Sequence, residues 1–253
     1  MLPKTSYLNN KKISSLINDD YQYAKVLNIF GIEFYNHYDD NLSDLCVSKG
    51  ISSEILFGYR SSLKETFSLD QKILKSCPIN LVIEYLKDNH NYFIKNKLPY
   101  LQNLISNIKE KKTFENFSKD IKFIFPIFFE DFVNHIYDEE NYFFSYIYKL
   151  FNANQGNIDS SSLFFMMDKF SIKKIALDHI NEDSEMEGIR GITKNYSFNK
   201  IKDLHLRVVF QELQEFDDEL SLHSDIENNI LFPKALNLEK KVSKILENIS
   251  YQN

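Results

Sequence analysis

The chain of 253 residues is 43% hydrophobic and 15% aromatic, and its formal net charge at pH 7 is −6. This hydrophobic fraction excludes a disordered chain, and the 6 Gly and 5 Pro supply too few turns for a β-barrel or a β-sandwich. Because this acidic chain has no basic block longer than the cluster at 109–112, composition also argues against nucleic-acid binding and leaves long helices as the expected structure.

The N-terminal segment has lysines but lacks the apolar run of about 7 to 15 residues that marks a secretory signal. No stretch approaches the ~18 apolar residues of a membrane-spanning helix. The cysteines, Cys46 and Cys77, are too few for a disulfide framework and lack the C-x-x-C spacing of thiolate metal sites. We therefore expect a cytoplasmic protein that contacts no membrane.

A small helical module is expected over residues 1–65. Helix-capping residues punctuate this segment at short intervals and predict three short helices, at residues 21–30, 42–49 and 54–59. Residues 62–77 are mixed and polar, and we interpret them as a linker. Pro78 suits the first turn of the helix that follows.

Residues 78–253 predict four long amphipathic helices, because their apolar side chains recur at three- and four-residue steps. The recurring positions are Ile83, Leu86, Phe93, Ile94, Leu101, Leu104 and Ile108; Phe128, Phe132, Phe143, Tyr146 and Leu150; Ile172, Ile175, Met186 and Ile189; and Val209, Phe216, Leu220 and Leu231. The polar stretches at 111–118, 152–162 and 195–199 are the expected breaks. The sequence therefore predicts an all-α fold in which an up-and-down four-helix bundle follows the small module.

Each of the four apolar stripes carries one histidine, and these histidines follow one another at nearly constant spacing. They are His90, His135, His179 and His223. Two of them have a glutamate at i+4, namely Glu139 and Glu227, so both side chains of each pair lie on one helix face. In an up-and-down bundle, this spacing allows all six side chains to meet at one level.

The cost of burial indicates a metal site at that level. A carboxylate buried without a partner costs several kcal/mol or shifts its pKa until it is neutral. Imidazole and carboxylate together suit iron, manganese or zinc, and two H-x-x-x-E pairs on facing helices suit two ions bridged by two carboxylates. The alternative is that the histidines are ordinary hydrogen-bonded core residues.

The remaining polar candidates are interpreted as structural. We expect His205 on the surface, His37 in a loop and Glu140 exposed to solvent beside Glu139. Asp183, at i+4 from His179, is either a hydrogen-bond acceptor for an imidazole or a solvated acid.

Three segments carry a resemblance to a known family: HSDIENNILFPKAL at 223–236, HIYDEENYFF at 135–144 and LDHINEDSEMEGIRGITKNY at 177–196. Together they resemble the hemerythrin-like bundle of the iron–sulfur cluster repair di-iron proteins, and the segment at 29–51 resembles the small N-terminal module of that family. The resemblance implies a hemerythrin-like four-helix bundle with two non-haem iron ions. It places the ligands at His90, His135, Glu139, His179, His223 and Glu227.

The resemblance also implies a function in the response to nitrosative or oxidative stress. The chain would deliver iron to damaged iron–sulfur proteins or remove NO, and whether it is an enzyme stays open. One departure matters, since many family members have a Cys-Cys pair where this chain has Tyr35 and Asn36. A reversible O2 or NO store or sensor and a metal-free interaction bundle remain as alternatives. The sequence leaves the oligomeric state open, a homodimer included.

Overall fold

The computed structural model of the protein describes residues 7–63, 71–109, 111, 114–157, 163, 165–167, 170–182, 186–197 and 201–250, without the side chains of 178–182, 249 and 250. Over these residues the fold is all-helical and contains no strand, which confirms the expected class. The chain forms two compact units. Unit 1 comprises Met1–Ser68, Tyr100–Ser118 and Thr193–Glu215, and unit 2 comprises Leu69–Pro99, Lys119–Ile192 and Phe216–Asn253.

Unit 1 contains the short helices of the N-terminal segment. They are α2 (Ile13–Asp19), α3 (Gln22–Ile29), the 3-10 turn η1 (Phe34–Asn36), α4 (Leu42–Lys49) and α5 (Ser53–Ser62). The predicted helices correspond to α3, α4 and α5, and α2 is an addition. Gly50 ends α4 in the left-handed conformation at φ 66°, and the Ser52 hydroxyl accepts a hydrogen bond from the Glu54 backbone at the start of α5.

Aromatic contacts tie the N-terminal segment to later parts of unit 1. The Tyr35 ring stacks on the His205 ring with 4.6 Å between centroids and 4° between planes, and the Phe34 ring meets His205 edge-on at 5.6 Å. His205 is 4% exposed, so the expectation of a surface residue is wrong. Its cover comes from a distant part of the chain, which helical periodicity does not reveal.

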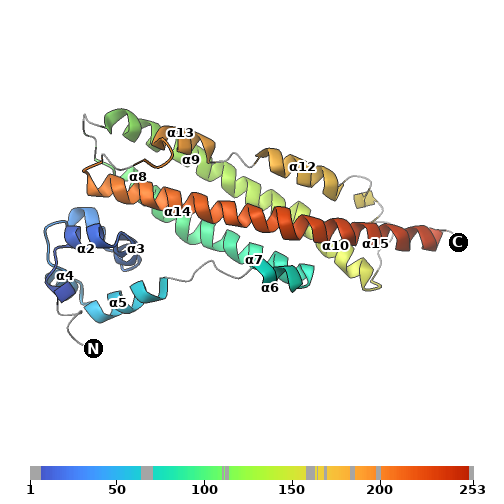
Figure 1. The fold of residues 1–253 in the computed structure, drawn as a ribbon, viewed down its shortest axis with the longest axis horizontal. Helices are drawn as coiled ribbons and strands as arrows, with labels where there is room; N and C mark the ends of the chain where they lie inside the picture. The colour runs from blue at the N-terminus through green and yellow to red at the C-terminus, as the bar shows by residue number, and fades with distance from the viewer. Residues whose placement is uncertain are drawn as a thin grey trace. The chain divides into compact units, whose positions relative to one another are not determined.

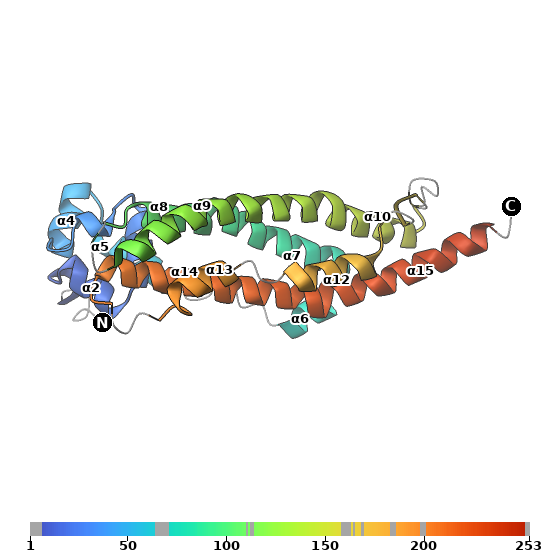
Figure 2. The ribbon, with the colours of Figure 1, turned by 90° about the horizontal axis from the view of Figure 1, so that it is seen from above.

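Unit 2 contains the longer helices. Its elements are α6 (Gln71–Ser76), α7 (Ile79–Tyr92), η3 (Phe93–Lys97), most of α9 (Glu115–Asp138), η5 (Glu139–Phe144), α10 (Ser145–Asn154), α12 (Ile172–Glu182), α13 (Glu187–Thr193), the second part of α14 (Leu204–Ile226), η6 (Glu227–Leu231) and α15 (Phe232–Ser250). Within this unit α12 lies along α15 (Figure 1), and α10 packs against both α7 and α15 (Figure 2). Buried Ile83, Leu86, Ile147, Leu150 and Leu231 belong to the core between these helices.

The structure places several boundaries differently from the prediction. Part of the predicted linker at 62–77 forms α6, and the predicted third helix comprises the separate helices α12 and α13. The units also divide the chain differently from the predicted domains 1–65 and 78–253, because α8 (Leu98–Ser106) and parts of α9 and α14 group with the N-terminal segment.

None of the described helices combines the length and the low polarity that a membrane crossing requires.

Candidate metal centre

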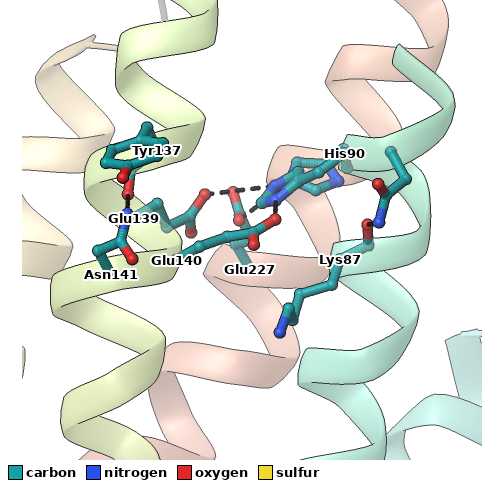
Figure 3. Close-up of polar contacts among 9 residues, drawn as sticks. Lys87, His90, Tyr137, Glu139, Glu140, Asn141 and Glu227 are labelled. Atoms are coloured by element: carbon teal, nitrogen blue, oxygen red, sulfur yellow. Dashed lines mark hydrogen bonds and ion pairs between the residues drawn. The ribbon is translucent and has the colours of Figure 1, made fainter. Parts of the chain in front are cut away.

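Two histidines and two glutamates meet in the interior of unit 2. His90 comes from α7, Glu139 opens η5, His223 belongs to α14 and Glu227 opens η6. All four are buried, and one potential ligand atom of each lies within 4.8 Å of those of the other three. Figure 3 shows Glu139, Glu140 and Glu227 directed toward His90 from the neighbouring helices. The cluster of His90, Glu139, His223 and Glu227 could hold a metal ion.

The contacts within the cluster converge. His90 Nε2 lies 3.0 Å from His223 Nε2 and 3.4 Å from Glu139 Oε2. Glu227 Oε1 lies 3.1 Å from His223 Nε2. The donor atoms thus face a shared space, as imidazole and carboxylate ligands of a transition metal do.

Three π-helical turns occur at the level of the cluster. The turns η3, η5 and η6 begin three residues after His90, at Glu139 and at Glu227. A π-turn closes its hydrogen bond from i to i+5 and so accommodates one residue more than an α-turn, and such turns are frequent at functional sites. Each helix that supplies the cluster therefore changes its register beside a residue of the cluster.

Glu140 lies against the cluster, although the sequence predicted it to be solvent-exposed. Its Oε1 lies 2.9 Å from His90 Nδ1, and its side chain is 30% exposed. Consecutive residues of an α-helix face different directions, but Glu139 and Glu140 open the π-turn η5 and both reach His90. The prediction was wrong because it assumed uninterrupted α-helical periodicity.

Aromatic rings cover the cluster at both ends along the helices. Toward one end, Phe93 packs edge-on against His223 at 5.7 Å and against Phe216 at 5.6 Å. Toward the other end, the Phe144 ring stacks parallel to His90 at 5.7 Å, and Phe143 stacks on Phe232. This apolar cover shields the cluster from water at these two ends and raises the cost of any charge there that has no partner.

The electrostatics of the cluster reflect this burial. Burial and the charge of Glu227 raise the pKa of Glu139 to about 7. The nearest donor to the Glu139 carboxylate is His90 Nε2, 3.4 Å from Oε2, and a proton on either carboxyl group lets Glu139 and Glu227 hydrogen-bond each other. Burial alone would lower the pKa of His90, but the hydrogen bond and charge of Glu139 raise it above its ordinary value. Without metal, a proton on Glu139 therefore relieves its repulsion with Glu227.

A cavity of about 230 Å³ adjoins the cluster. Its wall includes the four residues of the cluster together with His135, Met186, Arg190, Asp217, Ser221 and Asp225. Ser221 and Asp225 are exposed to solvent, so the cavity reaches the surface of unit 2. Arg190 from α13 donates two hydrogen bonds of 2.7 Å to the Asp217 carboxylate, which ties α13 to α14 in this wall.

Of the six predicted ligands, the structure brings together His90, Glu139, His223 and Glu227. His135 is half-buried and lines the cavity one turn before Glu139, outside the group of four. His179 belongs to α12, but its side chain lies outside the described residues, as does Asp183. Sequence reasoning missed the contact of Glu140 with His90, because apolar periodicity does not reveal the π-turn η5.

Comparison of the chain with models of known protein families gives no match, and comparison with curated proteins gives no significant one. The case for a function therefore depends on the resemblance of the motifs and on the geometry of the buried cluster.

Proposed function

We propose that unit 2 is an up-and-down four-helix bundle of the hemerythrin type that holds two iron ions. His90, Glu139, His223 and Glu227 bind the ions, with the two carboxylates as bridges. His135 from the cavity wall and His179 from α12 complete the ligand set. The spacing of the two H-x-x-x-E pairs and the convergence of four donor atoms support this assignment.

One observation carries the proposal: four titratable side chains share an apolar interior where they cannot satisfy one another. Among the described residues, neither oxygen of Glu139 has a partner at ordinary hydrogen-bond geometry, and His223 Nδ1 has no hydrogen-bond partner. Imidazole and carboxylate together favour iron, manganese or zinc over calcium and magnesium. The resemblance to the cluster repair family selects iron from these metals.

We further propose that the protein acts in the cytoplasm under nitrosative or oxidative stress, where it delivers iron to damaged iron–sulfur proteins or handles NO. Iron that keeps an open coordination position supplies binding and redox chemistry for diatomic ligands such as NO and O2. The cavity of about 230 Å³ has room for ligands of this size, and its opening beside Ser221 and Asp225 offers them a path from solvent. Tyr35 and Asn36 stand where the family has its thiol pair, so the proposal uses no thiol relay.

Metal analysis of the full chain tests the proposed centre. We expect about two iron ions per chain after anaerobic loading with Fe(II), and an absorption band in the visible range after oxidation. Glu139→Gln and Glu227→Gln should each lower the iron content, because each removes a bridging ligand. Asp138→Asn removes an exposed carboxylate from the same helix as Glu139 and serves as the control.

One tightly held zinc, no bound iron, or equal iron in all variants would contradict the di-iron assignment. The iron-loaded chain can then be incubated with an iron–sulfur protein whose cluster NO has damaged. Recovery of the cluster absorption supports iron delivery. Reversible binding of O2 or NO without such recovery favours a store or sensor instead.

A further inference from the structure

The two histidines of the cluster differ in what holds their outer nitrogens. His90 Nδ1 lies 2.9 Å from Glu140 Oε1, whereas His223 Nδ1 has no hydrogen-bond partner among the described residues. The His90 ring also lies parallel to the Phe144 ring, with 1° between their planes. The His90 ring is therefore held on its face by Phe144 and at Nδ1 by Glu140, whereas His223 Nδ1 has no such contact among the described residues.

The contact with Glu140 determines which nitrogen of His90 carries a proton. An ionised carboxylate only accepts hydrogen bonds, so Nδ1 is the donor in this contact. Nε2 is then the nitrogen whose lone pair is available, and it faces His223 and Glu139. A carboxylate that accepts from the outer nitrogen of an imidazole fixes the ring and increases the basicity of the inner nitrogen.

We propose that Glu140 is a positioning residue that fixes the His90 ring and makes its Nε2 a stronger donor to the metal centre than the Nε2 of His223. This inference rests on the proposed metal centre. An ion bound by His90 would be held more tightly and oxidised more easily than without the Glu140 contact, because a more basic ligand stabilises the higher charge. The π-turn η5 makes this possible, since it lets Glu139 and Glu140 contact opposite edges of one ring.

Titration of the full chain with Co(II), followed by visible absorption, tests the inference in Glu140→Gln. The variant keeps the size of the side chain and loses its charge. We expect Co(II) binding to weaken by roughly 10- to 100-fold and the absorption bands of bound Co(II) to shift. Glu140→Asp, which keeps the carboxylate, should recover part of the loss. In the iron-loaded protein, Glu140→Gln should raise the midpoint potential.

Asp138→Asn is the matched control, because it removes one carboxylate from the same stretch of helix without a contact to His90. It should leave the affinity, the spectrum and the potential close to those of the wild type. If Glu140→Gln melts at the wild-type temperature and matches Asp138→Asn in all three properties, Glu140 has no positioning role. If the wild type itself takes up neither Co(II) nor Fe(II), the proposed metal centre fails instead.

Discussion

Glu139 combines two properties that rarely occur together in one side chain: almost complete burial and the absence of a permanent counter-charge. Its neighbour Glu227 is buried as deeply, and the two repel each other when both are ionised. A proton relieves this repulsion, and so does a divalent cation between the carboxylates. A metal ion in the proposed centre would therefore compete with protons for the same residues.

This competition predicts how the metal-free protein responds to pH. The pKa of Glu139 rises from 4.5 to about 7 on folding, so its contribution to stability is complete below pH 4.5 and is lost as the pH rises through 7. The raised pKa of His90 acts in the same direction above its ordinary value. We expect the free energy of unfolding of the metal-free chain to decrease between pH 5 and pH 8, with about 3 kcal/mol attributable to Glu139. Urea unfolding at several pH values measures this decrease.

Glu139→Gln is the control for the pH effect, because the amide is uncharged at every pH in this range. Its stability should fall less than that of the wild type between pH 5 and pH 8. Parallel pH profiles for the two proteins would show that Glu139 does not titrate as described. With metal bound, the wild type should gain stability as the pH rises, since the metal no longer has to displace protons.

At the scale of the element, the π-turns separate what the sequence could predict from what it could not. The i+4 spacing of His223–Glu227 follows from α-helical geometry, and this pair does meet in the cluster. His135 has the same spacing from Glu139 but lies outside the group of four, so the i+4 rule alone does not account for the position of Glu139. A π-turn depends on the packing of the whole helix and leaves no mark in the apolar periodicity. The position of Glu140 consequently escaped prediction.

Shortening η5 by one residue tests whether its π-turn serves the cluster. Deletion of the exposed Asn141 leaves the number of residues that an α-turn needs, so Phe143 and Phe144 should stay in the core. Glu139 and Glu140 can then no longer both face His90. We expect an almost unchanged circular dichroism spectrum and a metal affinity lower by roughly tenfold or more.

Asn141→Ala, which keeps the length of η5, separates the loss of the side chain from the loss of the turn. The amide of Asn141 donates a hydrogen bond to the Tyr137 carbonyl within its own helix, so this variant should bind metal like the wild type. Equal metal affinities in the deletion and in Asn141→Ala would show that the π-turn is not needed for the site.

At the scale of the whole molecule, the periodicity of residues 78–253 predicted the helical class and most helix positions. It did not predict that 100–118 and 193–215 group with the N-terminal segment. That grouping involves contacts such as the stack of Tyr35 on His205, whose partners are far apart in sequence. No local pattern encodes such a pair, and for the same reason His205 was assigned to the surface.

Tyr35→Ala tests the contribution of this stack. Removing a buried aromatic ring costs about 3–5 kcal/mol, so we expect a clear decrease in the free energy of unfolding, measured in urea. Tyr35→Phe keeps the ring and should cost less than about 1.5 kcal/mol. The metal content per folded chain should stay unchanged in both variants, because every described residue of the cluster belongs to unit 2. If Tyr35→Ala is as stable as the wild type, the stack of Tyr35 on His205 does not contribute to the free energy of unfolding.

The aromatic cover at both ends of the cluster bears on the speed of exchange. Phe93 and Phe144 close the route along the helix axes, and the cavity that ends at Ser221 and Asp225 offers a path for small molecules. A diatomic gas would pass along it within the lifetime of the folded state. A chelator is far larger than a diatomic gas, so we expect removal of a bound ion to require that α13 separate from Asp217. Loss of metal would then be slow, dependent on salt through the Arg190 ion pair, and independent of the chelator concentration.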